Sequence, residues 1–170
     1  MNDNKKALKD ISYGVYLVTS MDDNKKNGQI VTTAFQVTSE PPKIAVCISK
    51  ETLTHEFIAK SKKMGISVLE QDVPMTFIGT WGFKSGRDID KFQGVKYKVG
   101  KVTGVPLVTD YTLSTMEVNV ISEQDVGTHT IFVGEVVNSE VVKEGTKLTY
   151  EYYQTEKKGK APKTAPTYNA

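Results

Sequence analysis

The chain has 170 residues, a net charge of +2, 38% hydrophobic and 25% charged residues, and one cysteine, Cys47. This composition is typical of one globular domain, and its apolar runs are too short to cross a bilayer. The scattered lysines exclude a nucleic-acid footprint, and the lone cysteine excludes an internal disulfide or a cysteine-ligated metal centre. Because no secretory signal pattern is seen, we expect a cytoplasmic protein with a small-molecule partner.

The first fifty residues carry mainly strand signals. β-Branched and aromatic residues over 11–20 predict a strand, and the polar stretch 21–28 predicts a turn after it. A second strand is expected over 29–38, because the proline pair that follows has no amide hydrogen for a ladder. Alternating residues over 43–50 predict a third strand.

Two stretches carry helix signals. Apolar residues at helical spacing within 51–63, with Thr52 or Thr54 as the cap, predict a short helix. The segment 72–82 mixes proline and glycine with apolar residues, and its pattern does not decide between a short helix and a loop.

The later strands indicate the fold class. Residues 64–70, 111–122 and 128–142 read as strands, with a polar loop over 82–92 before the last two. Many short strands with one or two inserted helices favour a mainly β, mostly antiparallel barrel over a doubly wound sheet. The two usual glycine-rich nucleotide fingerprints do not occur.

The last part of the sequence differs in composition. Residues 154–170 are charged, contain prolines and have no apolar periodicity. We therefore expect a domain over residues 1–153 followed by a mobile extension or linker.

One strand face carries small, hydrogen-bonding residues if the strands 29–38 and 43–50 pair. Such a face suits a flat ligand, because small side chains let a ring approach the backbone while hydroxyls and amides satisfy its polar edge. A solvent-facing strand is the alternative, although a wet face usually carries lysine and glutamate. The residues of this face would be Thr32, Ala34, Gln36, Thr38, Ala45, Cys47 and Ser49.

The segment between the third strand and the helix is a candidate phosphate site. Ser49, Lys50, Thr52 and Thr54 offer hydroxyls and a cation beside a helix N-terminus, which favours an anion. A simple helix cap, which needs only one of the threonines, is the alternative.

The stretch SGRDIDKF, residues 85–92, is a second candidate. Gly86 permits close backbone approach, and the planar guanidinium of Arg87 suits a phosphate. A surface loop in which Arg87 pairs with Asp88 or Asp90 explains the same residues equally well. Lys91 is similarly ambiguous.

The two histidines do not form a catalytic signature. His55 is expected in the first turn of the helix as a surface or cap residue, and His129 opens a strand, where it is a hydrogen-bonded residue or touches a ring at the mouth of the barrel. No triad, paired-carboxylate or metal-spaced pattern is seen. If the protein is an enzyme, the chemistry belongs to a cofactor.

Six blocks in order resemble the flavin reductase-like FMN-binding proteins over roughly residues 8–153. They are ISYGVYLVTS, NGQIVTTAFQVTSEPPKIAVCISK, THEF, FKSGRDIDKF, TGVPLV and VGTHTIFVGEVV. The similarity is greatest to flavoredoxin-type proteins and to the flavin reductase domain of high-molecular-weight rubredoxins. Unlike the rubredoxin fusions, this sequence has no paired C-x-x-C motifs.

The resemblance implies an antiparallel, Greek-key split β-barrel, a homodimer, and FMN bound near the dimer interface. The cofactor-binding residues that it implies are Thr32, Thr33, Gln36, Val37, Thr38, Ser49, Lys50, Thr54, Ser85, Gly86, Arg87, Lys91 and His129. Within the strand, Thr32, Gln36 and Thr38 are expected to face the flavin while Phe35 and Val37 pack into the barrel. For Thr33, strict alternation predicts a side chain that points toward the core, whereas the matched motif places it at the cofactor.

The activity that the resemblance implies is an FMN-dependent oxidoreductase that transfers electrons from NADH or NADPH to flavin or to a small, rubredoxin-like redox partner. No metal and no catalytic side chain is expected, with His129 at most a modulator of the flavin. An FMN-binding electron carrier without direct NAD(P)H oxidation is the alternative. A third possibility is a barrel that has lost flavin.

Overall fold

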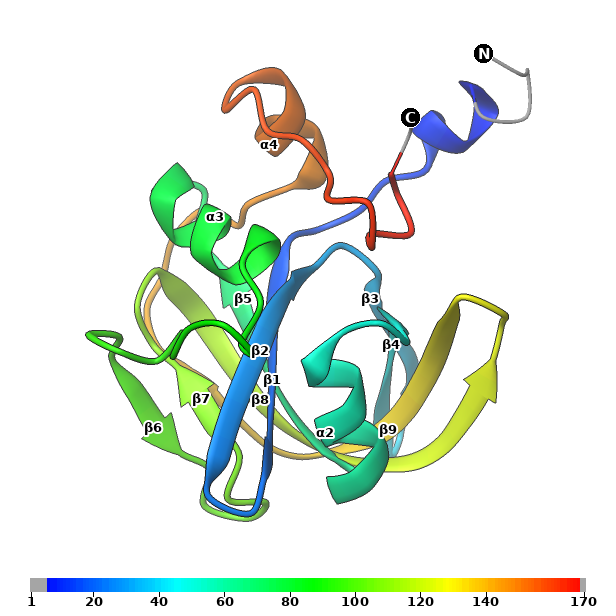
Figure 1. Ribbon diagram of the computed structural model, residues 1–170, viewed down its shortest axis with the longest axis vertical. Helices are drawn as coiled ribbons and strands as arrows, with labels where there is room; N and C mark the ends of the chain where they lie inside the picture. The colour runs from blue at the N-terminus through cyan, green and yellow to red at the C-terminus, as the bar shows by residue number, and fades with distance from the viewer. Residues whose placement is uncertain (1–5, 169–170) are drawn as a thin grey trace.

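A seven-stranded antiparallel sheet forms the body of the molecule in the computed structural model, which describes residues 6–168 (Figure 1). Its order is β2-β1-β5-β8-β9-β4-β3. The strands are β1 Tyr16–Asp22, β2 Lys25–Val31, β3 Ala34–Ser39, β4 Pro42–Ser49, β5 Lys63–Leu69, β8 Thr112–Asp125 and β9 His129–Val141. A separate two-stranded sheet pairs β6, Tyr97–Val99, with β7, Pro106–Val108. Residues 1–5 of the expected domain and residues 169–170 of the expected extension lie outside the described residues.

The helices cover the sheet from two sides. They are α2 Leu53–Ser61, α3 Met75–Phe83 and α4 Tyr150–Thr155, after a short 3₁₀ turn, η1, over Leu8–Asp10. In Figure 1, α2 lies between β2 and the β4–β9 side of the sheet, while α3 and α4 lie together near the other end. Among residues 6–168, none of the helices has the length and apolar character needed to cross a membrane.

Both faces of β1 are buried, so the sheet separates two cores. Leu17 belongs to a cluster with Trp81 and Tyr150, on the side of α3 and α4. Its neighbour Val18 belongs to a second cluster with Ile58 of α2 and Phe132 of β9. Consecutive strand residues point to opposite faces, which explains how one strand supplies both cores.

The β1–β2 hairpin is tighter than the sequence suggested. The strands pair as far as Asp22 and Lys25, leaving a two-residue turn in which Asp23 has φ 49°. Aspartate tolerates this left-handed conformation, and such turns match the twist of the strands. The predicted turn over 21–28 was therefore too long.

Helix α2 agrees with its predicted start. The Thr52 hydroxyl accepts a hydrogen bond from the amide of His55 at 3.3 Å, so Thr52 is the cap. The helix ends at Ser61. The next residue, Lys62, has φ 56° and donates its amide to the carbonyl of Ile58 at 2.9 Å. The undecided segment 72–82 contains a helix too, α3, which begins after Pro74 and buries Trp81.

The predicted strand 29–38 is broken at Thr32 and Thr33, which separate β2 from β3. In the pairing of β3 with β4, Ala34 lies opposite Val46 and Phe35 lies opposite Ala45. Opposite residues of an antiparallel pair share a face. The predicted grouping of Ala34 with Ala45 was therefore wrong.

The side chains of Phe35 and Val37 do not pack into the barrel as expected. Phe35 is 59% exposed and Val37 48% exposed. The reason is that β3 is an end strand whose only neighbour is β4, and its pairing shifts at a bulge between Gln36 and Thr38. These two side chains form an apolar patch on an open sheet edge.

A buried carboxylate fixes the loop between β6 and β7. Glu117 of β8 is fully buried and accepts hydrogen bonds from the amides of Lys101, Val102 and Thr103, from the Thr103 hydroxyl and from the Asn138 amide, at 2.7 to 3.0 Å. Burial alone would raise the pKa of Glu117, but these hydrogen bonds outweigh it and lower the pKa to about 2.

Replacing Glu117 with glutamine should destabilise the protein by roughly 1.5–3 kcal/mol near neutral pH, because hydrogen bonds to a charged group are lost and an amide NH₂ faces donors. The pKa of this carboxyl is lower in the folded protein than in the unfolded chain. Its contribution to stability is therefore complete at pH values above the unfolded pKa and is lost as the pH falls through the folded pKa. The difference between wild type and variant should therefore shrink as the pH falls from about 4.5 toward about 2.

Urea melts across this pH range measure the effect. Glu140→Gln is the matched control, because Glu140 forms an exposed pair with Lys98 at 2.8 Å and its loss should change stability much less than the loss of Glu117. Equal stability losses in the two variants would contradict the assignment of Glu117 as the anchor.

Candidate functional site

A cavity of about 320 Å³ runs along the outer edge of β2. β2 is an end strand, so this edge is not paired with another strand. Residues 27 and 29–31 of β2 and the following Thr32 line one side of the cavity, together with residues 47 and 49 of β4 and residues 51–54 at the start of α2. Residues 78 and 81–86 in and after α3, with Lys91, line another part. The remaining lining residues are Val15, Tyr150, Tyr153 and residues 160–167. Elements from both cores and the C-terminal segment therefore meet at this edge.

Lys91 binds the open edge of β2. Its ammonium donates hydrogen bonds to the carbonyl oxygens of Gly28 at 2.9 Å and Trp81 at 3.2 Å. The side chain is buried, and burial lowers its pKa to about 8. The loop after α3 is thus held against β2 by a cation that donates to backbone carbonyls, which leaves positive charge beside the cavity.

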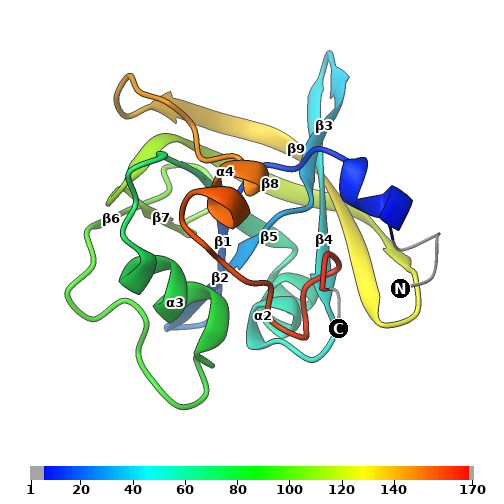
Figure 2. The same cartoon turned by 90° about the horizontal axis from the view of Figure 1, so that it is seen from above.

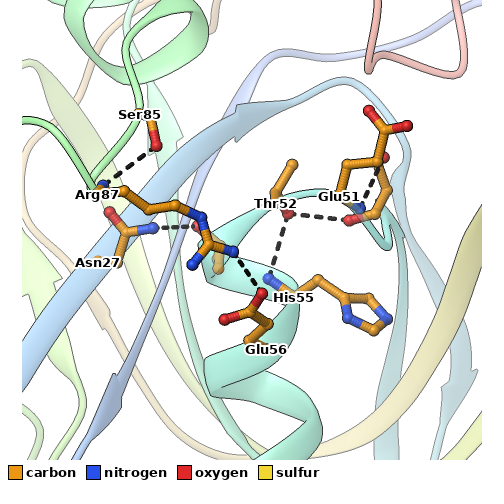
Figure 3. Close-up of polar contacts among 9 residues, drawn as sticks. Asn27, Glu51, Thr52, His55, Glu56, Ser85 and Arg87 are labelled. Carbon is orange, nitrogen blue, oxygen red and sulfur yellow. Dashed lines mark hydrogen bonds and ion pairs between the residues drawn. The ribbon is translucent and has the colours of Figure 1, made fainter.

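Hydroxyl groups gather at the start of α2. Ser49 and Thr54 are both buried and line the cavity, and the Thr52 hydroxyl donates to the carbonyl of Ser49 at 2.9 Å. Thr54 accepts a hydrogen bond from the Asn27 amide at 3.0 Å (Figure 3). A helix leaves its first amides without partners inside the helix, and its N-terminus favours negative charge. This end of the cavity is therefore suited to a phosphate.

The loop of residues 84–87 closes the same end. A methyl group built on Gly86 would overlap the end of the Asn27 side chain, so glycine lets the loop lie this close to β2 without displacing that side chain. The Ser85 hydroxyl accepts from the amide of Arg87 at 3.1 Å. The guanidinium of Arg87 pairs with Glu56 of α2, as Figure 3 shows, and does not line the cavity.

The structure brings together about half of the cofactor residues expected from sequence. Those that line the cavity are Thr32, Ser49, Thr54, Ser85, Gly86 and Lys91. Those that do not are Thr33, Gln36, Val37, Thr38, Lys50, Arg87 and His129. The second group lies on β3 or around the rim.

Most of the second group has partners within the chain. The Thr33 hydroxyl donates to the carbonyl of Cys47 at 3.1 Å, and Lys50 pairs with Asp125 at 2.6 Å. Gln36 donates to the carbonyl of Thr38 at 3.1 Å on the exposed part of β3. In the single chain, then, the exposed residues 35–39 of β3 do not line the cavity.

His129 contacts the C-terminal segment. Its Nε2 lies 3.0 Å from the carbonyl oxygen of Thr164, and because a carbonyl only accepts, Nε2 carries the hydrogen. In the neutral ring Nδ1 then accepts from the Thr128 hydroxyl at 2.8 Å. The other histidine, His55, bonds to the hydroxyl of Thr130 at 2.8 Å, and burial lowers its pKa.

Cys47 lines the cavity as a neutral group. The side chain is half-buried, and burial raises the pKa of its thiol. A thiol with a raised pKa is a poor nucleophile near neutral pH. Within residues 6–168, no three His, Cys, Asp or Glu side chains are arranged to hold a metal ion. The side chains of the cavity thus supply binding groups and not a reactive centre.

The sequence interpretation missed one wall of the cavity. Trp81, Tyr150 and Tyr153 line it from α3 and α4, and residues 160–167 cross it. Trp81 is in a segment whose structure was undecided, and α4 is a six-residue helix without a strong pattern. The composition of the tail gave no indication that it packs on the domain.

The donor set fits a flavin nucleotide. Hydroxyls and helix amides at one end match a phosphate, while the apolar Val31 and Trp81 and the small Cys47 elsewhere leave room for a flat ring.

Comparison with known proteins agrees with this fit. The flavin reductase like domain matches residues 8–160. A ferric-chelate reductase (NAD(P)H) of Archaeoglobus fulgidus is 52% identical over 162 residues, which cover 95% of each chain. A high molecular weight rubredoxin of Moorella thermoacetica is 47% identical over 163 residues, covering 96% of this chain and 71% of that protein.

Solved structures share the fold at low identity. A homolog of nitrilotriacetate monooxygenase component B from Mycobacterium thermoresistibile superposes with a TM-score of 0.75 at 20% identity, covering 86% of this chain and 79% of that one. An FMN-binding protein from Thermus thermophilus gives a TM-score of 0.72 at 23% identity, with coverage of 78% and 72%. The mainly β, antiparallel split-barrel class expected from sequence is confirmed. The chain belongs to the flavin reductase-like family.

Proposed function

We propose that this protein is an FMN-dependent oxidoreductase that accepts electrons from NADH or NADPH and passes them to flavin or to a small redox partner. The observation that carries the proposal is the cavity beside β2, whose phosphate-compatible end is built from the family-matched residues Ser49 and Thr54. The relative from Archaeoglobus fulgidus, named as an NAD(P)H-dependent reductase, supports the electron donor. FMN in preference to FAD is part of the proposal.

The residues of the cavity would hold the cofactor by distinct interactions. Ser49, Thr54 and the first amides of α2 would bind the phosphate, and Thr32 offers a hydroxyl along the edge of β2. Trp81 provides an apolar wall that excludes water from the site. When bound, the flavin supplies the hydride and electron chemistry, so no side-chain nucleophile or base is required.

We also propose that the remaining family-matched residues complete the site in a homodimer. Thr33, Gln36, Val37 and Thr38 lie on or beside β3, and Lys50, Arg87 and His129 lie around the rim of the cavity. β3 has one unpaired edge and carries the exposed apolar side chains of Phe35 and Val37. A second copy of the chain covering this patch would bring the β3 residues next to a cofactor near the interface.

The electron acceptor follows from the relatives as a set of candidates. The rubredoxin relative supports a small, rubredoxin-like redox protein, and the name of the Archaeoglobus fulgidus relative adds ferric chelates as substrates. The proposal keeps the division into a flavin-binding domain, residues 1–153, and an extension, residues 154–170. It keeps the protein in the cytoplasm, where Cys47 stays reduced.

Anaerobic mixing of the FMN-loaded protein with NADH or NADPH tests the activity. We expect the flavin absorbance to bleach with at least one nicotinamide. Bleaching only with a reduced protein donor would favour the electron-carrier alternative. A protein that takes up no flavin on titration would contradict both.

The Ser49→Ala variant should bind FMN with a dissociation constant raised by roughly tenfold to a hundredfold, because a charge-assisted hydrogen bond worth about 1.5–3 kcal/mol is lost. Titration followed by flavin fluorescence measures the affinity. The matched control is Ser61→Ala, since Ser61 lies at the far end of α2 and does not line the cavity. An unchanged affinity in Ser49→Ala would remove this residue from the phosphate site.

The Phe35→Glu variant tests the dimer. A charge in the apolar patch on β3 should shift the protein from dimer to monomer and weaken FMN binding. Light scattering after size exclusion measures the mass. Leu8→Glu, another exposed apolar residue outside β3, is the control and should remain dimeric. A wild-type protein that runs as a monomer and still binds FMN tightly would contradict the dimer.

A further inference from the structure

The segment after α4 folds back over the cavity. Residues 160–167 line the cavity beside α3, β2 and the start of α2. In Figures 1 and 2 this segment, drawn in red, runs from α4 across the molecule toward the side of β3 and β4. The extension expected to be mobile thus forms one wall of the site.

A specific contact turns the segment back at its start. The amide of Gly159 donates to the carbonyl of Tyr153 at 2.8 Å, and the Tyr153 hydroxyl donates to the carbonyl of Lys160 at 2.8 Å. A methyl group built on Gly159 would overlap the Tyr153 ring. The preceding Lys158 has φ 54°, which completes the reversal. Tyr153 is itself buried in the core. This anchor is therefore built into the domain.

The far part of the segment is held at the rim of the barrel. The Thr164 carbonyl accepts from His129 at 3.0 Å, and the hydroxyls of Thr167 and Thr32 lie 3.5 Å apart. A turn joins the amide of Ala165 to the carbonyl of Pro162 at 2.9 Å. None of residues 160–167 is buried. A segment without fully buried residues opens at a lower cost than the buried elements of the domain.

We propose that residues 160–167 form a strap that closes the cofactor cavity and sets the rate at which flavin enters and leaves. This inference rests on the proposed function for its ligand. The strap is anchored at Gly159 and Tyr153 and latched at His129. Because the latch involves Thr32 and His129, both matched to flavin-binding positions of the family, opening of the strap and binding of flavin take place at the same residues.

Removal of the strap gives the first test. A chain that ends at Lys158 keeps α4 and the Thr149 cap. Its FMN release rate, measured by fluorescence after dilution into excess competing flavin, should rise by at least about tenfold over wild type. The thermal midpoint and circular dichroism spectrum check that the domain remains folded.

A point variant tests the same idea in the full chain. Gly159→Ala places a methyl group against Tyr153 and should loosen the strap, which raises the release rate by about threefold or more. Gly79→Ala is the matched control, because a methyl group there has open space around it. This control should exchange flavin at the wild-type rate.

Labelling of the single cysteine provides a measurement that does not depend on flavin. Cys47 lines the cavity under the strap, so a thiol reagent should modify it faster in the truncated chain and in Gly159→Ala than in wild type or Gly79→Ala. Faster labelling without any flavin binding would support the strap while the proposed function fails. Equal labelling and equal FMN release in all four proteins would overturn the strap.

Discussion

The unpaired edge of β2 is the feature on which the rest of the site depends. β2 and β3 are the two ends of the sheet, yet only Thr32 and Thr33 join them in the sequence. Because so short a link cannot cross seven strands, the sheet must curl so that its two ends lie close together without pairing. Backbone groups on a free edge need partners. Lys91 supplies one for Gly28, and the cavity occupies the space beside the rest of the edge. The split in the barrel is therefore what makes room for a ligand.

The electrostatics of the cavity favour an anion and leave the chemistry to a cofactor. Burial lowers the pKa of Lys91 to about 8, so near neutral pH it remains mostly charged while bonded to carbonyls that do not neutralise it. Burial raises the pKa of the Cys47 thiol, which keeps that side chain neutral. Together with the N-terminus of α2, this arrangement attracts phosphate without presenting a nucleophile.

The sequence allowed prediction of what depends on local pattern. The antiparallel strands, helix α2 with Thr52 as its cap, and the hydroxyl cluster of Ser49 and Thr54 all have short-range signals. The predicted grouping of Ala34 and Gln36 with Ala45 and Cys47 was wrong because the register shifts at a bulge between Gln36 and Thr38. The extra residue places Ala34 opposite Val46 instead of Cys47, and the alternation of the sequence does not indicate a bulge.

The remaining errors concern contacts between distant segments. The position of the tail depends on Tyr153, whose hydroxyl and ring hold residues after Gly159, and composition carries no information about that partner. The strands β6 and β7 are three residues each and depend on the loop that Glu117 holds from β8. Such elements exist because of tertiary contacts, so patterns of propensity cannot indicate them.

One wall of the cavity, formed by β4 and α2, is more rigid than the other, which is the strap of residues 160–167. The affinity for flavin and its rate of exchange therefore depend on different parts of the structure. Ser49 and Thr54 are buried and belong to β4 and α2, which pack on the sheet, whereas no residue of the strap is buried. Affinity for a phosphate then depends mainly on the rigid wall, while the barrier to entry and release depends on the strap. Opening of the strap would then control the exchange of flavin without changing the rigid wall. The contacts of residues 160–167 with His129 and Thr32 would therefore decide how long this protein retains a bound flavin.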